Sequence, residues 1–118
     1  MPRYFTPEEY KSELNLEQTA IVLERLASDE DISGNIELPI EFFFMSDSMD
    51  KMEEIEEKLE ELGYDIDSIE KYDDGIELIG NTAPMKMTVE TINEWKKQMW
   101  DLGFSFDCKL DGWHVLVD

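Results

Sequence analysis

The chain has 118 residues, of which 30 are acidic and 10 are basic, so its formal net charge at pH 7 is −20. This length predicts a single domain over residues 1–118. No apolar run is long enough to cross a bilayer, and the first residues lack the apolar core of a signal peptide. We therefore expect a cytoplasmic protein without a membrane partner.

The charge and the scarcity of metal-binding side chains limit the partners. One cysteine, Cys108, and one histidine, His114, exclude a disulfide framework and a zinc or iron–sulfur cluster, so we expect no metal or cofactor. Residues 46–75 hold 13 acidic residues and three lysines, half of the net charge. Such a potential repels phosphate backbones, so we predict no direct nucleic-acid binding and a protein partner with an Arg- and Lys-rich segment. Acidity that only keeps the protein soluble is the alternative.

An N-terminal helical arm is predicted over residues 6–30. Thr6-Pro7-Glu8-Glu9 has the capping hydroxyl, the proline and the glutamate that begin a helix. Asn15-Leu16-Glu17-Gln18 repeats the pattern and leads into apolar residues spaced three or four apart, which predicts a helix over residues 16–28. Residues 29–34 have loop composition, so they separate the arm from a core domain over residues 35–118.

The first strand of the core is predicted from an alternation of period two. The apolar positions are Ile36, Leu38, Ile40, Phe42 and Phe44. Pro39 cannot donate a ladder hydrogen bond, so the fully paired part begins at Ile40. Phe43 and Met45 interrupt the polar side, which is typical of a central strand.

Three further elements follow the first strand. Ser46 or Ser48 caps a helix that reaches Leu62 and ends at Gly63, with apolar residues every three or four positions. Residues 64–72 form a second strand, and Asp73-Asp74-Gly75 is a hairpin turn into a third strand that opens with Ile76 and Leu78. We expect these two strands to pair antiparallel.

The last part of the chain is predicted to be a helix and a strand. Thr88 caps the helix and Gly103 stops it. The alternation of Phe104, Phe106, Cys108 and Leu110 with polar residues then predicts the fourth strand. Asp111-Gly112 makes a turn, and residues 113–117 form an apolar extension.

The order β-α-β-β-α-β predicts an α+β, ferredoxin-like fold, in which two helices cover one face of an antiparallel sheet and an extra N-terminal helix precedes them. The residues predicted to be buried in one core are Phe42, Phe44, Ile55, Leu59, Ile66, Leu78, Trp95, Met99, Phe104 and Phe106.

No catalytic residues are predicted. His114 has no Ser or Cys partner at a recognisable spacing, and Cys108 falls on the apolar side of its strand, so both are interpreted as packing residues. The glutamate pairs of residues 49–62 lie on a solvated helix face, where nothing tunes their pKa values for acid–base chemistry. We therefore expect a protein that is not an enzyme.

The open face of the sheet is the predicted interaction surface. By strand parity it carries Glu37, Glu41, Asp65, Asp67, Glu77 and Asp107, with Phe43, Ile69 and Ile79 among them. These acids and Phe43 favour a basic protein segment over RNA. The alternative is that the N-terminal helix covers this face. Trp113 is the other candidate for partner binding, although its parity favours a plug of the core.

Four features together resemble one known family. They are the arm from Leu16 to Leu26, the strand Ile40-Glu41-Phe42-Phe43-Phe44, the helix end Leu62-Gly63-Tyr64 and the motif Asp111-Gly112-Trp113. In order and spacing they resemble the bacterial B-type regulator of ribonuclease E activity over residues 13–115. The resemblance implies a ferredoxin-like domain without catalytic activity, which binds the Arg-rich scaffold region of ribonuclease E and lowers RNA turnover.

The leading hypothesis is therefore a noncatalytic regulator that docks an acidic surface onto a basic segment of a ribonuclease. Two other classes remain open at this point. One is a small α+β domain that senses a metabolite, and the other is an immunity-type or nucleic-acid-mimicking acidic protein. The metabolite-sensing domain needs no salt-sensitive protein partner, whereas the other two hypotheses require one.

Overall fold

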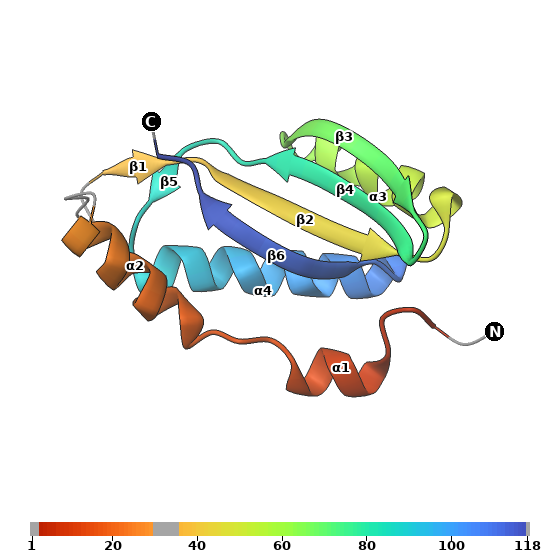
Figure 1. The fold of residues 1–118 in the computed structure, drawn as a ribbon, viewed down its shortest axis with the longest axis horizontal. Helices are drawn as coiled ribbons and strands as arrows, with labels where there is room; N and C mark the ends of the chain where they lie inside the picture. Colours follow the sequence, from red (N-terminus) through yellow and green to blue (C-terminus); the bar gives the residue numbers. More distant parts are fainter. Residues whose placement is uncertain (1–2, 30–35, 118) are drawn as a thin grey trace.

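The structure, a computed structural model, describes residues 3–29 and 36–117. Its helices and strands are labelled in Figure 1. In chain order they are α1 (Pro7–Ser12), α2 (Gln18–Asp29), β1 (Glu37–Leu38), β2 (Ile40–Ser46), α3 (Met49–Glu61), β3 (Asp65–Tyr72), β4 (Gly75–Asn81), β5 (Met85–Lys86), α4 (Val89–Phe106) and β6 (Lys109–Val115).

A four-stranded sheet in the order β3-β4-β2-β6 forms the centre of the molecule, and all neighbouring strands run antiparallel. The helices α3 and α4 lie behind this sheet in Figure 1 and pack on the same face. The short strands β1 and β5 make a separate antiparallel ladder at one end. The predicted α+β class with antiparallel strands is confirmed, including the β3–β4 hairpin.

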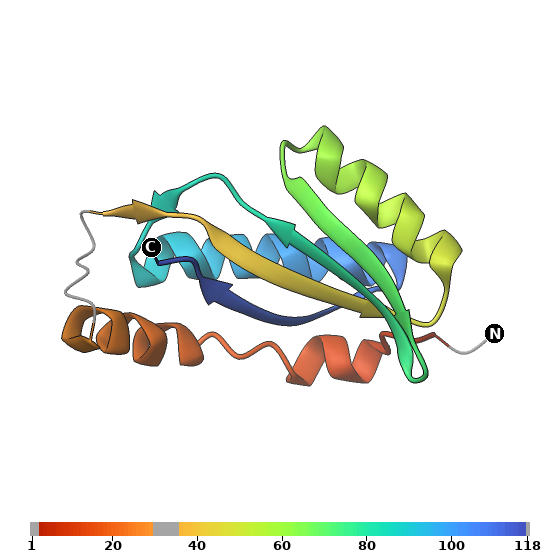
Figure 2. The ribbon, with the colours of Figure 1, turned by 45° about the horizontal axis from the view of Figure 1, so that its top comes forward.

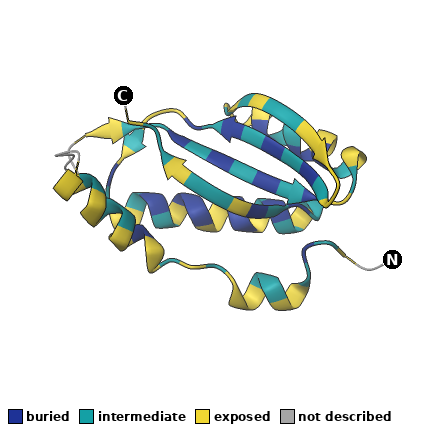
Figure 3. Cartoon of the chain, in the orientation of Figure 1, coloured by how far each residue is buried: buried dark blue, intermediate teal, exposed yellow. Residues whose placement is uncertain are grey.

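Strand parity follows the prediction in β2 and β4. Buried residues alternate with half-buried ones along both strands, as the colouring in Figure 3 shows. Phe42 and Phe44 are fully buried in the core between the sheet and the two helices. Seven of the ten predicted core residues are buried, while Ile66, Phe104 and Phe106 are half-buried against that core.

The break at Pro39 divides the first predicted strand as expected. The main-sheet strand β2 starts at Ile40, whose N–H donates to the hydroxyl of Thr82 at 2.9 Å. The carbonyl of Pro39 accepts a hydrogen bond from the N–H of Leu116 at 3.0 Å. A proline without a donor is thus placed where the chain passes from one ladder to the other.

The predicted end of α4 is wrong. The helix continues through Gly103 to Phe106, so Phe104 and Phe106 belong to the helix and not to a fourth strand. It ends in a Schellman motif, in which the N–H of Cys108 donates to the carbonyl of Gly103 at 2.8 Å. The left-handed residue of this motif is Asp107, with φ 58°, where a glycine is the usual choice.

Gly103 serves close packing rather than helix termination. A Cβ at this position would lie 2.3 Å from the carbonyl oxygen of Cys108 and 2.9 Å from a ring carbon of Phe44. The alternation of Phe104, Phe106 and Cys108 therefore does not mark a strand. Phe104 and Phe106 belong to the last turn of α4, which packs directly against the start of β6.

We expect Gly103→Ala to destabilise the protein by about 2–3 kcal/mol, because a methyl group would collide with backbone that cannot move aside. Urea unfolding monitored by circular dichroism measures the loss. Gly63→Ala is a useful comparison, since a Cβ there meets no atom within 4 Å and only the left-handed φ of 97° opposes it. Equal stability of Gly103→Ala and wild type would contradict this explanation of the helix end.

The predicted turn at Asp111-Gly112 is also wrong, because both residues lie within β6. In the pairing of β6 with β2, Gly112 is opposite Phe43 and Leu110 is opposite Phe44, which leaves Asp111 as an extra residue in a β-bulge. The bulge reverses the parity of the strand, so the apolar extension of residues 113–115 is the second half of β6.

The N-terminal arm is fixed along the edge formed by α4 and β6. Its Phe5 is fully buried, which the sequence did not indicate. The carbonyl of Tyr10 accepts a hydrogen bond from the indole N–H of Trp100 at 2.8 Å, and Lys96 Nζ donates to the carbonyl of Asn15 at 2.5 Å. Burial lowers the pKa of Lys96. Lys109 Nζ binds carboxylates of α1 and the residue after it.

Two views show that the arm runs below β6, beside the sheet and not across it (Figures 1 and 2). In the described ranges, the open side of the sheet therefore has no helix over it, and the hypothesis that the N-terminal helix covers this face is wrong. None of the helices described is both long and apolar enough to cross a membrane.

Candidate functional site

The open face of the sheet, defined as the side turned away from α3 and α4, is built from three cross-strand rows. Its central row joins Ser68, Ile79, Phe43 and Gly112. One flanking row joins Asp65, Asn81, Glu41 and His114, and the other joins Glu70, Glu77, Met45 and Lys109. The ammonium of Lys109 is paired with Glu9 and Glu13 of the arm. A small apolar centre thus lies between two rows that carry carboxylates.

Glu41, Phe43 and His114 form a cluster on this face. Glu41 and His114 are directly opposite each other on β2 and β6, and His114 Nε2 lies 3.0 Å from Glu41 Oε1. The rings of Phe43 and His114 have centroids 5.7 Å apart and planes inclined at 35°. The side chain of His114 is 54% exposed, so its interpretation as a packing residue is wrong.

Two acids of the open face lie directly opposite each other. Glu70 on β3 pairs with Glu77 on β4. Like charges at such positions repel, which destabilises the ladder. The hydroxyl of Tyr72 donates to Glu70 at 2.6 Å, and this hydrogen bond raises the pKa of Tyr72. A cation bound between Glu70 and Glu77 would relieve the repulsion.

A bulge in β3 changes which of its residues face outward. Register shifts between Ile66 and Ser68, so Asp67 is the extra residue, and its carboxylate accepts a hydrogen bond from the amide of Asn81 at 2.9 Å. Beyond the bulge Ile69 is opposite the buried Leu78 and packs against the core. The prediction that Ile69 faces outward is therefore wrong, because simple alternation does not survive a bulge.

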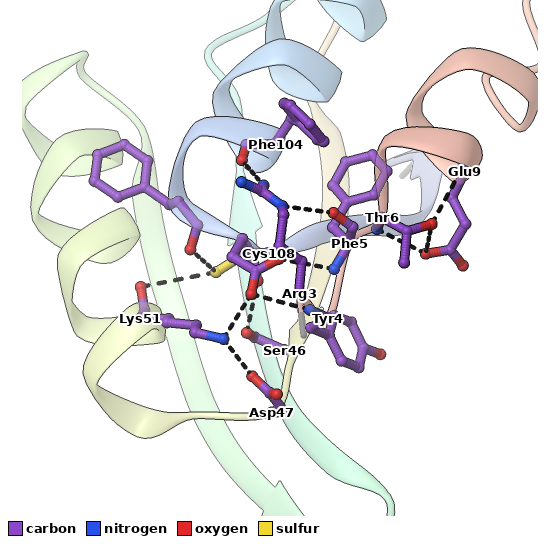
Figure 4. Close-up of polar contacts among 12 residues, drawn as sticks. Arg3, Tyr4, Phe5, Thr6, Glu9, Ser46, Asp47, Lys51, Phe104 and Cys108 are labelled. Carbon is purple, nitrogen blue, oxygen red and sulfur yellow. Dashed lines mark hydrogen bonds and ion pairs between the residues drawn. The ribbon is translucent and has the colours of Figure 1, made fainter. Parts of the chain in front are cut away.

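Asp107 does not lie on the sheet face, contrary to prediction. Its carboxylate accepts hydrogen bonds from the N–H groups of Tyr4 and Phe5 at 3.0 and 2.8 Å and from Lys51 Nζ at 2.6 Å. Figure 4 shows how Arg3, Lys51 and Ser46 gather around this end of α4. Burial raises the pKa of Asp107, but these hydrogen bonds outweigh it and hold the pKa below its ordinary value. Asp107 thus fixes the N-terminal segment.

The remaining predicted partner-binding residues lie elsewhere. Glu37 is exposed on β1, opposite Lys86 in the two-stranded ladder and outside the main sheet. Trp113 is opposite Phe42, on the inner side, and its ring centroid lies 6.5 Å from that of Trp95. Its position favours the plug of the core over an interface anchor. Glu41, Phe43, Asp65 and Glu77 share the open face, and Asp67 lies beside them at its bulge.

Cys108 is a buried packing residue, as predicted. Its side chain has no exposed surface, and burial raises the pKa of its thiol to about 12. Because the thiolate is the nucleophilic form, this cysteine is unreactive at neutral pH. Within residues 3–29 and 36–117, no group of three or more His, Cys, Asp or Glu side chains is placed to hold a metal ion.

His114, Met45 and Glu70 belong to the open face although sequence reasoning did not select them. Met45 follows Phe43 by two residues on β2, and His114 is brought beside Phe43 by the β2–β6 pairing. Glu70 faces outward because of the bulge at Asp67. The alternation along β2 could have assigned Met45, because it shares the parity of Glu41 and Phe43. The outward orientation of Glu70 and His114 could be assigned only from the register of the strands, because each follows a bulge.

Comparison with known proteins places these features in a family. A search of curated proteins gives no match. Residues 16–115, which are 100 of the 118 residues, match the family described as Regulator of ribonuclease activity B. The matched segment includes α2, the whole main sheet and the Asp111-Gly112-Trp113 bulge. The chain therefore belongs to the family of regulators of ribonuclease activity B.

Proposed function

We propose that this chain is a cytoplasmic, noncatalytic regulator that binds a basic segment of a ribonuclease through the open face and thereby modulates RNA degradation. Membership of the ribonuclease-regulator family supports a ribonuclease as the target. The resemblance of its motifs makes the Arg-rich scaffold region of ribonuclease E the first partner to test. The observation that supports the choice of surface is an uncovered sheet face whose apolar centre is flanked on both sides by carboxylates, Glu41 and Asp65 on one side and Glu70 and Glu77 on the other.

We also assign the core to the ferredoxin-like arrangement. The four long strands β2, β3, β4 and β6 have the spatial order β3-β4-β2-β6, and a helix follows the first and the third of them. Both helices pack on one face, which leaves the other face free for contacts. The short β1–β5 ladder and the arm are additions at the ends of this arrangement.

Charge determines how such a face would work. With a net charge of −20, the whole molecule attracts a basic segment from a distance, and this attraction mainly raises the association rate. The potential is screened over about 8 Å at physiological salt, so association should slow as ionic strength rises. The apolar centre around Phe43 and Ile79 then contributes contacts that salt does not screen.

Two sets of charge reversals distinguish the open face from the acidic surface of α3. The first set is Glu41→Lys, Asp65→Lys and Glu77→Lys, and the second is Glu53→Lys, Glu57→Lys and Glu61→Lys. Both sets change the net charge equally, so long-range attraction falls by a similar amount in each. We expect the first set to reduce the association rate at least about tenfold more than the second. Stopped-flow binding of the ribonuclease scaffold segment over a salt series measures both.

The matched sets also separate a specific face from general acidity. Equal slowing by both sets would mean that only net charge matters, and the proposed surface would be wrong. Binding as fast as wild type by both variants would overturn acidic docking altogether. Melting curves of each variant show whether the core has been disturbed, since Glu41 and Glu77 are half-buried.

A further inference from the structure

We propose that Glu41 and Phe43 form a subsite, occupied by the side chain of His114 in the free protein, that selects an arginine side chain over a lysine. This inference rests on the proposed function, because it specifies which basic residue of the partner is recognised on the open face. Glu41 and Phe43 share one face of β2, and His114 on the adjacent strand β6 lies against both of them.

His114 shows what this subsite accepts. Its imidazole is a flat ring with its nitrogen atoms in the ring plane, and it lies against Phe43 while Nε2 approaches Glu41 at 3.0 Å. A guanidinium is likewise flat and carries N–H donors in its plane. It can stack on the ring of Phe43 and give two parallel hydrogen bonds to the carboxylate of Glu41. The histidine therefore occupies the position that a partner's arginine would take.

The surroundings leave room for this exchange. Gly112 is opposite Phe43 on β6, and a Cβ built there would meet only Phe43 Cδ2, at 3.6 Å. No side chain thus covers Phe43 from that position. The side chain of His114 is 54% exposed and can turn toward solvent, while that of Glu41 is 23% exposed and stays accessible.

Selectivity arises from shape and hydration rather than from charge. The carboxylates of Asp65, Glu70 and Glu77 attract lysine and arginine alike, because the Coulomb attraction depends on the charge and not on the shape of the cation. A lysine ammonium is compact and strongly hydrated, so it gains less from a ring face and a single carboxylate than a guanidinium does. The subsite adds the face of the Phe43 ring to the carboxylate of Glu41, which is the combination that a guanidinium fits.

Peptide binding tests the subsite directly. Two probes of equal length and charge, an Arg-Ser repeat and a Lys-Ser repeat, are titrated into the full chain at low and physiological salt. We expect the Arg-Ser peptide to bind about tenfold more tightly. Phe43→Ala and Glu41→Gln should each remove most of this ratio. Phe43→Ala should also leave the affinity for the Lys-Ser peptide within about twofold of the wild-type value. Ile79→Ala, beside Phe43 on β4, is the matched control and should keep the ratio.

The outcomes separate this inference from the proposed function. Equal, salt-sensitive binding of both peptides to wild type would overturn the subsite and leave acidic docking intact. Binding of neither the peptides nor the ribonuclease segment would overturn both. If Phe43→Ala weakened the two peptides equally, Phe43 would be a general apolar contact and the subsite would be wrong. His114→Ala should preserve the ratio, because arginine takes its place.

Discussion

Replacing Phe42 by alanine is expected to lower the free energy of unfolding by about 3–5 kcal/mol, a large part of the stability of a small protein. Phe42 is fully buried, and its ring contacts those of Tyr64 and Trp95 with centroid distances of 5.5 and 6.0 Å. The tip of the ring fills the space beside Gly80, where a Cβ would lie 2.7 Å from Phe42 Cζ. Alanine would leave a cavity there that the glycine backbone cannot fill.

Phe43→Ala is the matched control for this prediction, because the same change is made one residue along β2 on the open face. Phe43 is half-buried, so its loss should cost about 1 kcal/mol. Urea unfolding of the two variants gives both values. Similar losses would contradict the difference in burial between Phe42 and Phe43, and a larger loss for Phe43→Ala would show that the strand parity is reversed.

Asp107→Ala is expected to destabilise the protein by about 3–4 kcal/mol. The substitution removes the acceptor for two backbone N–H groups and for Lys51, and it leaves alanine in a left-handed conformation that Asp tolerates better. The N-terminal segment with the buried Phe5 should then detach first. Hydrogen exchange of the N–H groups of Tyr4 and Phe5 should accelerate strongly in the variant.

The contribution of Asp107 should also depend on pH with a defined sign. Its folded pKa is lower than that of the unfolded chain, so the carboxylate stabilises the fold fully above the ordinary pKa of about 3.9. This stabilisation is lost as the pH falls through the folded pKa. The difference in unfolding free energy between wild type and Asp107→Ala should therefore shrink in acid.

Asp107→Asn is the conservative comparison, because asparagine tolerates the left-handed conformation and keeps one acceptor oxygen. It should cost about half as much as alanine and should show little of the pH dependence. A difference between wild type and Asp107→Ala that stayed constant from pH 7 to strongly acidic conditions would contradict the assigned role.

The sequence predicts well where one local rule acts alone. The capping box of Thr6 and Glu9 forms as expected, and the alternation of Ile40, Phe42 and Phe44 correctly identifies the buried side of β2. Gly63 ends α3 in a left-handed conformation, with φ 97°. In these places the tertiary structure reinforces the local preference, so propensity and packing give the same answer.

The errors occur where tertiary contacts override a local pattern. Gly103 resembles a helix stop, but it is required for the approach of Cys108 and Phe44, and Asp107 takes the left-handed position. The bulges at Asp67 and Asp111 reverse the parity of β3 and β6, which moved Ile69 inward. Neither close approach between segments nor register leaves a periodic signal in one sequence.

These errors also explain why only part of the open face could be predicted. Glu41, Phe43 and Glu77 follow from alternation in strands without a bulge, whereas His114 reaches the face only through the bulge at Asp111. The Asp-Gly-Trp motif acquires a physical meaning from this register. Asp111 makes the bulge, Gly112 places no side chain opposite Phe43, and Trp113 packs against the core.

We propose that the open face, and not the acidic surface of α3, contacts a basic ribonuclease segment. Amide and side-chain NMR shifts of the labelled chain, recorded while that segment is titrated at physiological salt, locate the contact most directly. We expect the largest shifts at Glu41, Phe43, Ile79 and His114, with an affinity that weakens as the salt concentration rises. Shifts confined to Glu53, Glu57 and Glu61 on α3, with the open face unchanged, would contradict it.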